Sequence, residues 1–114
     1  MKKRALKIVE LAQAVKAIEP VILDLRKVSN FCDFFVIITG TSQTHIRAIA
    51  DNIETGLKKQ SLTSRHKEGY KYTHWVVLDY NSVIVHIFND ETRKFYDLEH
   101  LWADAPIVEI NQKG

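Results

Sequence analysis

A chain of 114 residues, 46% of them hydrophobic and 26% charged, can bury one core but not two, so we expect a single domain over residues 1–114. Its formal net charge of +2 argues against a protein whose affinity comes mainly from wrapping nucleic acid. Cys32 is the only cysteine, which excludes an internal disulfide and favours a reducing, cytoplasmic setting. The sequence has no signal-peptide pattern and no apolar run of membrane-spanning length.

The first part of the chain alternates helix and strand signals. Apolar residues at helical spacing predict a helix from Lys2 to about Ile18, which Pro20 would end, and residues 21–25 predict the first strand. After a loop, the uninterrupted apolar run at residues 34–39 predicts a strand that is buried on both faces.

A Gly-Thr-Ser turn follows this strand and leads into a second predicted helix. Thr41 or Ser42 is expected to cap this helix, which runs to about Gln60. One side of the helix is charged, and the other carries an apolar stripe of Ile46, Ile49, Ala50, Ile53 and Leu57. Residues 61–73 are polar and predict little beyond a short edge strand near residues 64–67.

A β-hairpin is the clearest prediction of the second half. Asn81 and Ser82 predict its two-residue turn, because Asn tolerates the positive φ that such turns require. Side-chain alternation then gives one face of core residues, namely Val76, Leu78, Tyr80, Val83, Val85 and Ile87. The opposite face mixes aromatic, acidic and imidazole groups, namely Trp75, Val77, Asp79, Ile84, His86 and Phe88. This mixture is typical of a protein-binding surface.

The chain then returns to helical signals. Residues 90–95 predict a turn or a single helical turn, and residues 97–103 predict a short helix with Asp97 as its N-cap, closed before Pro106. The order helix, strand, strand, helix, edge strand, strand, strand, helix predicts an α/β fold of the α+β type, with a mixed sheet and packed helices.

The turn at Gly40 is the most enzyme-like feature, because backbone N–H groups at a helix N-terminus can hold a phosphate. Nucleotidyltransferases add paired carboxylates that hold divalent metal ions, whereas Asp79 stands alone. Helix capping explains the turn better, so we expect no enzymatic activity, catalytic residue or cofactor. The histidines lack metal-ligand spacing, so no metal site is expected, and His45 is expected to be exposed on the second helix.

Four other side chains have competing interpretations. Cys32 is expected to be a small buried residue, because no basic neighbour lowers its pKa. Arg93 is expected on a solvated surface, and core packing is favoured for Trp102. His86 is either a half-buried sheet residue or part of a binding surface, and the pattern does not decide between them.

These segments together resemble the ribosomal silencing factor family, also called the Iojap-related family. The segments that carry the resemblance are LDL at 23–25, CDFFVIITGTS at 32–42, His45 with IAD at 49–51, WVVLDY at 75–80, VIVHIF at 83–88 and RxFYDLExLW at 93–102. Each segment alone is a weak pattern, but their order and spacing cover nearly the whole chain. One departure is Asn81-Ser82, where the family usually has a glycine in the turn.

The resemblance implies a nucleotidyltransferase-like domain that is not an enzyme. Such factors bind the large ribosomal subunit through ribosomal protein L-fourteen and block subunit joining, which represses translation. The family's partner-binding patch, carried over to this chain, comprises Trp75, Asp79, His86, Phe88 and Tyr96. It also implies no membrane and no sequence-specific nucleic acid as partners, and weak homodimerisation through the exposed patch is compatible with it. The alternatives are a metal-dependent nucleotidyltransferase and an RNA-binding module.

Overall fold

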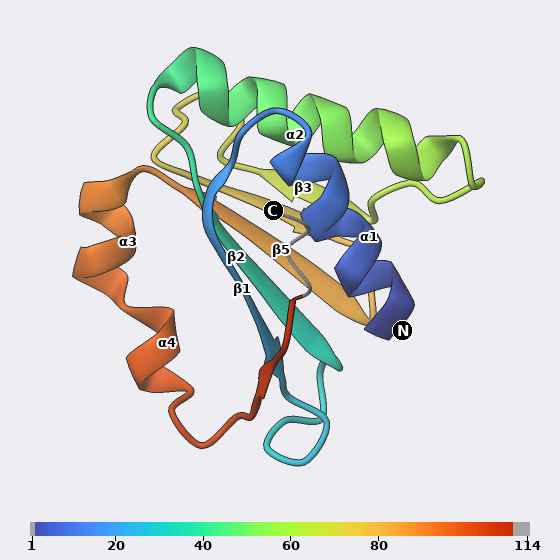
Figure 1. The fold of residues 1–114 in the computed structure, drawn as a ribbon, viewed down its shortest axis with the longest axis vertical. Coiled ribbons are helices and arrows are strands. Elements are labelled where there is room, and N and C mark those ends of the chain that lie inside the picture. The colour runs from blue at the N-terminus through green and yellow to red at the C-terminus, as the bar shows by residue number, and fades with distance from the viewer. Residues whose placement is uncertain (1, 111–114) are drawn as a thin grey trace.

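The computed structural model describes residues 2–110 and contains one six-stranded sheet in the order β3-β4-β5-β2-β1-β6 (Figure 1). The helices are α1 (Lys2–Gln13), α2 (Gln43–Lys58), α3 (Asp90–Tyr96) and α4 (Leu98–Leu101), and the strands are β1 (Ile18–Asp24), β2 (Phe34–Thr39), β3 (His66–Glu68), β4 (Trp75–Asp79), β5 (Val83–Phe88) and β6 (Ile107–Val108). Strands β2 and β5 are parallel, and the other neighbours are antiparallel. The predicted mixed sheet with packed helices is therefore confirmed.

Helix α1 is shorter than predicted. It ends at Gln13, and the chain reverses at Lys16, which has a φ of +63°. The N–H of Lys16 bonds to the carbonyl of Gln13 at 2.9 Å and the N–H of Ala17 to that of Ala12 at 3.1 Å, which is the hydrogen-bond pattern of a Schellman helix end. Such an end usually contains glycine, so lysine gave no signal for it.

Pro20 does not end a helix, so that prediction was wrong. It lies inside β1, which begins at Ile18, and the pairing of β1 with β2 shifts register between Ile18 and Val21. A bulge leaves one residue outside the ladder, which is why a proline without an N–H is tolerated there.

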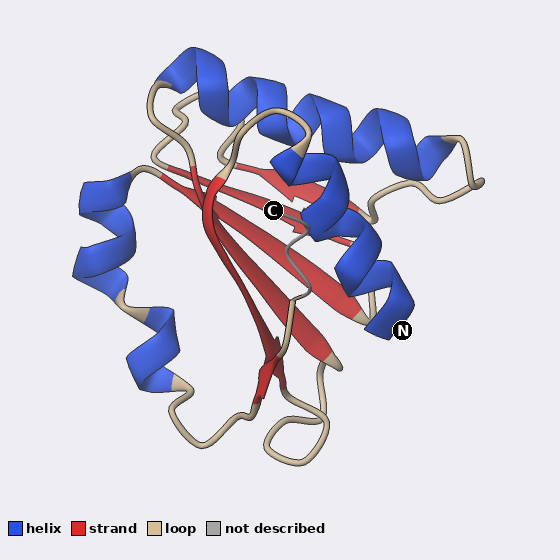
Figure 2. Cartoon of the chain, viewed as in Figure 1, coloured by secondary structure: helices blue, strands red, loops and turns tan. Residues whose placement is uncertain are grey.

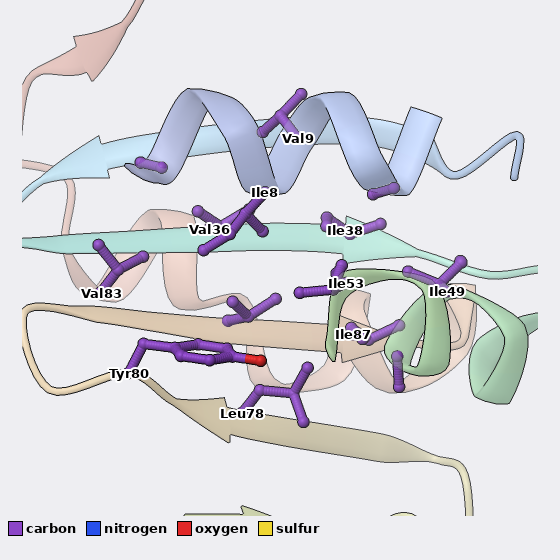
Figure 3. Packing of buried hydrophobic residues seen from close by; sticks show 14 of the residues in the cluster. Ile8, Val9, Val36, Ile38, Ile49, Ile53, Leu78, Tyr80, Val83 and Ile87 are labelled. Carbon is purple, nitrogen blue, oxygen red and sulfur yellow. The ribbon is translucent and has the colours of Figure 1, made fainter. Parts of the chain in front are cut away.

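Helices α1 and α2 cover one face of the sheet, and α3 and α4 lie on the other (Figure 2). The predicted stripe of α2 is fully buried, and every residue of β2 is buried, as the apolar run predicted. Figure 3 shows how side chains from the two helices meet those of β2, β4 and β5 in this core, among them Ile8, Val36, Ile53, Leu78 and Ile87.

The hairpin has the predicted register. Trp75 pairs with Phe88 and Asp79 with Ile84, and the turn residue Asn81 has a φ of +71°. The side chain of Asp79 accepts the N–H of Asn81 at 2.8 Å, which holds the turn. Alternation along the hairpin therefore assigns its side chains to the two faces as expected.

The C-terminal part differs in detail from its prediction. Helix α3 makes nearly two turns instead of one, and Asp97 caps α4 as predicted by accepting the N–H of His100 at 3.3 Å. The two residues of β6 add an edge strand to β1 that was not predicted, because two residues are too few to show alternation. No helix among residues 2–110 is both long and apolar enough to cross a membrane.

Candidate protein-binding surface

The sheet face under α3 and α4 is covered only in part. A second apolar cluster joins this face of β1, β2 and β5 to the residues that follow β5, through Leu23, Phe35, Ile37, Phe88, Leu98 and Ala105. Strand β4 lies outside this cover, and its Trp75, Val77 and Asp79 are half-buried while Val76 and Leu78 are fully buried. One strip of the sheet is thus open to a partner.

Four aromatic rings connect this strip to the core. The ring of Trp75 stacks on Phe88 at 5.0 Å and contacts Tyr96 at 4.7 Å, and Tyr96 meets Phe95 edge-on at 5.0 Å. Exposure rises along this aromatic ladder from 1% at Phe88 to 49% at Tyr96 and 80% at Phe95. The ladder places large rigid rings at the surface and supports them from below, which is the construction of a binding hot spot.

A hydrogen bond fixes the orientation of Trp75. Its indole Nε1–H donates to Nδ1 of His86 at 3.0 Å. Because an indole can only donate, Nδ1 must be unprotonated and the imidazole proton lies on Nε2. Burial lowers the pKa of His86 to about 4, so the ring is neutral and remains an acceptor for Trp75 at neutral pH.

Two of the five predicted site residues lie beneath the surface. Phe88 is 1% exposed, so the expectation that it faces outward was wrong, and His86 is 6% exposed, which favours the alternative of a hydrogen-bonded sheet residue. The prediction treated the whole hairpin face as open, whereas the helices after β5 cover the β5 half of it. Trp75 and Tyr96 reach the surface, and Asp79 lies at the other end of the open strip, about 13 Å along β4 from Trp75.

Phe95 was missing from the predicted set, although it is the most exposed aromatic of the ladder. Next to it, a groove of about 470 Å³ separates α3 from the start of β4 and is lined by His74, Trp75, Asn89, Glu91, Thr92, Phe95 and Tyr96. The available signal was two adjacent aromatics in an otherwise polar helix, which cannot both pack inward.

Arg93 explains why α3 turns its aromatics outward. It is 7% exposed, and its guanidinium bonds the two carboxylate oxygens of Glu99 at 3.1 and 3.3 Å. It also donates to the carbonyl of Glu19 at 2.8 Å and to Oγ1 of Thr39 at 2.9 Å. The prediction of a solvated Arg93 was wrong, because two of these partners, Glu19 and Thr39, come from distant parts of the chain.

The turn after β2 is a helix cap, as predicted. Ser42 Oγ accepts the N–H of His45 at 3.0 Å, while the N–H of Thr41 donates to Nδ1 of His45 at 2.9 Å. Nε2 of the same ring lies 2.7 Å from the carbonyl of Val15, so His45 is half-buried and the prediction of an exposed residue was wrong. Two N–H groups that a phosphate would use are therefore bonded within the protein.

Two further chemical interpretations are settled by burial. Cys32 is 5% exposed, and burial raises its thiol pKa to about 11, so it is a structural residue as predicted. Trp102 packs against the second apolar cluster, with its ring 5.9 Å from that of Phe35, which confirms its packing role. Within residues 2–110, no three side chains of His, Cys, Asp or Glu are grouped to hold a metal ion.

Comparison with known proteins identifies the family. Residues 1–114 match the model described as ribosomal silencing factor during starvation. The chain is 38% identical over 95 residues to the ribosomal silencing factor of Halalkalibacterium halodurans, covering 83% of this chain and 81% of that protein. It is 34% identical over 110 residues to that of Bacillus subtilis, covering 96% and 93%.

A solved structure shows the same fold. The crystal structure of a Chromobacterium violaceum protein is similar with a TM-score of 0.88 at 23% identity, over 100% of this chain and 90% of that one. The fold and the matched sequence agree with the resemblance carried by the motifs of strands β2, β4 and β5. This chain belongs to the ribosomal silencing factor family.

Proposed function

We propose that this protein binds the large ribosomal subunit through ribosomal protein L-fourteen and thereby blocks subunit joining, which represses translation in the cytoplasm. One observation carries the proposal: the aromatic ladder opens onto an uncovered strip of the sheet in a chain of the ribosomal silencing factor family. The mechanism is steric exclusion, which needs an occupied surface and no chemical step. The nucleotidyltransferase likeness implied by the resemblance concerns the fold only.

The composition of the surface supports a protein partner. Phe95 and Tyr96 supply exposed rings, Trp75 is held rigid beneath them, and the adjacent groove can receive a side chain of the partner. Rigid aromatics lose little conformational entropy on binding and dominate many interfaces. Phe95 and Tyr96 thus form the anchor, while His86 and Phe88 support it from inside.

Acidic groups border the same surface and complement a basic partner. Glu91 lines the groove, and Asp79 and Glu68 lie on the open side of β4 and β3. Ribosomal proteins that bind RNA are commonly basic, so these carboxylates favour the encounter and disfavour acidic competitors. A second copy of this acidic surface would repel it, so any homodimer through this face is expected to be weak.

Separated ribosomal subunits provide the test. Added protein should sediment with free large subunits and reduce the fraction of assembled ribosomes in a density gradient. Phe95→Ala should cost at least about 2 kcal/mol of binding free energy, a roughly thirtyfold weaker complex, because it removes an exposed anchor. As a separate variant, Asp79→Lys should also weaken binding, because it replaces attraction to a basic partner with repulsion.

The matched control is Phe31→Ala, which removes another exposed phenylalanine. Phe31 is 58% exposed and contacts Phe35 and Trp102 far from the groove, so binding should be unchanged. Equal losses from both variants would contradict the assignment of the surface. Sedimentation of the protein with small subunits would contradict the proposed function itself.

A further inference from the structure

The basic residues of this chain are unevenly distributed in space. Three elements bring basic residues to the end of the sheet where β4 turns into β5, and we call this the basic end: Lys2, Lys3, Arg4, Lys58, Lys59 and Arg65. These bases begin α1, end α2 and precede β3, and Figure 1 shows the start of α1 beside that end of the sheet. The family motifs do not include any of the six.

Side-chain contacts bring the three groups to the same hairpin turn. Arg4 donates to Oγ of Ser82 at 3.3 Å, and Arg65 donates to Oδ1 of Asn81 at 2.7 Å. Lys58 lines a small hollow of about 180 Å³ together with Tyr80, which precedes the turn. Cationic groups from α1, α2 and the segment before β3 therefore surround three consecutive residues.

Within the described chain, the bases of this end are not held in ion pairs, and the carboxylates nearby have other contacts: Asp79 accepts the N–H of Asn81, and Glu54, which lines the hollow with Lys58, pairs with Lys67. Some bases elsewhere are paired, as Arg26 is with Asp24 at 2.7 Å and Lys67 with Glu54 at 2.8 Å, whereas others in the described part of the chain, such as Lys16 and Lys71, form no ion pair. Among residues 2–110, none of the six bases forms an ion pair. The opposite end carries the acidic start of α3, where Asp90 pairs with Lys94 at 2.9 Å and Glu91 lines the groove. A chain with a net charge of only +2 thus carries a local cluster of six bases around one hairpin turn.

We infer that the basic end binds the phosphate backbone of RNA as an accessory contact, which on the ribosome supplements the protein-binding surface. The charge favours a polyanion, and the exposed large apolar side chains of the described chain lie outside α1, α2 and residues 59–67. A membrane would require an apolar anchor and a tight protein interface an aromatic one, whereas phosphate contacts require charge alone. The small net charge limits the contact to a few phosphates.

This inference rests on the proposed function for its ribosomal setting, but naked large-subunit rRNA tests it directly. Binding to this rRNA should weaken as salt rises from about 50 to about 200 mM, since phosphate contacts release counterions. Lys3→Glu combined with Lys59→Glu should lower the slope of log affinity against log salt by about two, because each lost phosphate contact removes roughly 0.9. Both side chains are exposed, so the fold should persist, and thermal unfolding checks it.

The matched control is Lys16→Glu combined with Lys71→Glu, two exposed bases outside the basic end with the same change in net charge. It should retain the salt slope of the unmodified protein, and both double variants should still bind isolated L-fourteen. If both double variants lose rRNA binding equally, the loss reflects net charge alone and the inference is overturned. The inference is also overturned if the unmodified protein does not bind rRNA. If the unmodified protein does not bind isolated L-fourteen, this result contradicts the proposed function instead.

Discussion

At the scale of single residues, Trp75 and His86 show how a buried group can support a surface. The indole needs an acceptor and the imidazole provides one only while it is neutral, so the hydrogen bond at 3.0 Å depends on the lowered pKa of His86. Nε2 of His86 has no hydrogen-bond partner, and the Phe35 ring lies edge-on with its centroid 4.5 Å from that of the imidazole. Protonation would place a charge between aromatic rings and abolish the acceptor.

The lowered pKa predicts a loss of stability in mild acid. The unfolded chain binds a proton at His86 below about pH 6.5, whereas the folded protein does so only near pH 4. Protonation therefore favours unfolding across this window, and the free energy of unfolding should fall by about 3 kcal/mol between its two ends. Urea unfolding at several pH values measures this. His86→Gln retains an acceptor for Trp75 and should remove the decrease in the free energy of unfolding that His86 causes. If the variant shows the same pH profile as the unmodified protein, His86 is not the cause of the decrease.

Two adjacent valines test the assignment of the hairpin faces. Val76 is fully buried and Val77 is half-buried on the opposite face of the same strand. Val76→Ala should lower the free energy of unfolding by about 2 kcal/mol through lost burial and a cavity, and Val77→Ala by less than half as much. Leu78→Ala should cost roughly 2–5 kcal/mol for the same reason. Denaturant titration compares them, and similar losses for both valines would contradict the face assignment.

At the scale of elements, α3 is attached to the rest of the protein by the buried guanidinium of Arg93 and not by an apolar stripe. Its one buried residue is Arg93, which pairs with Glu99 of α4. Arg93 also donates to the carbonyl of Glu19 in β1 and to the hydroxyl of Thr39 at the end of β2. These bonds fix the rotation of the helix, and this rotation directs Phe95 and Tyr96 outward. The binding surface thus depends on an ion pair on its inner side.

Arg93→Met should therefore destabilise the protein by about 2 kcal/mol. The variant keeps much of the side-chain volume but leaves the Glu19 carbonyl and the Thr39 hydroxyl without their donor. Glu99 is partly exposed, so water replaces some of its lost interaction. Lys94→Met is the matched control, because Lys94 is 76% exposed and should change stability by less than about 0.5 kcal/mol. Chemical denaturation of both variants measures the two free energies of unfolding. If Arg93→Met leaves this free energy unchanged, the bonds of Arg93 do not hold α3 in place.

At the scale of the whole molecule, two surfaces with different character lie on one sheet. The aromatic surface lies at the start of β4 and on α3, whereas the basic end lies beyond the end of β4, next to Asp79. A partner that offers basic protein and RNA phosphate side by side matches both. This arrangement also orients the molecule, because reversing it would bring like charges together.

Much of this architecture was readable from the sequence alone. The α2 stripe, the fully buried β2 and the hairpin register all follow from repeating patterns, because helical and strand periodicities are local properties of the backbone. The turn at Asn81 and the cap at Ser42 were also predictable, since each depends on the chemistry of a few neighbouring residues.

Only the tertiary structure decided which parts of each face stay exposed. Alternation places His86 and Trp75 on one face, but the segment after β5 buries the first and leaves the second half-exposed. The burial of Arg93 has the same origin, since two of its three partners, Thr39 and Glu19, lie 54 and 74 residues away in the chain. Local sequence determines which way a side chain points, whereas exposure depends on what packs over it from distant parts of the chain.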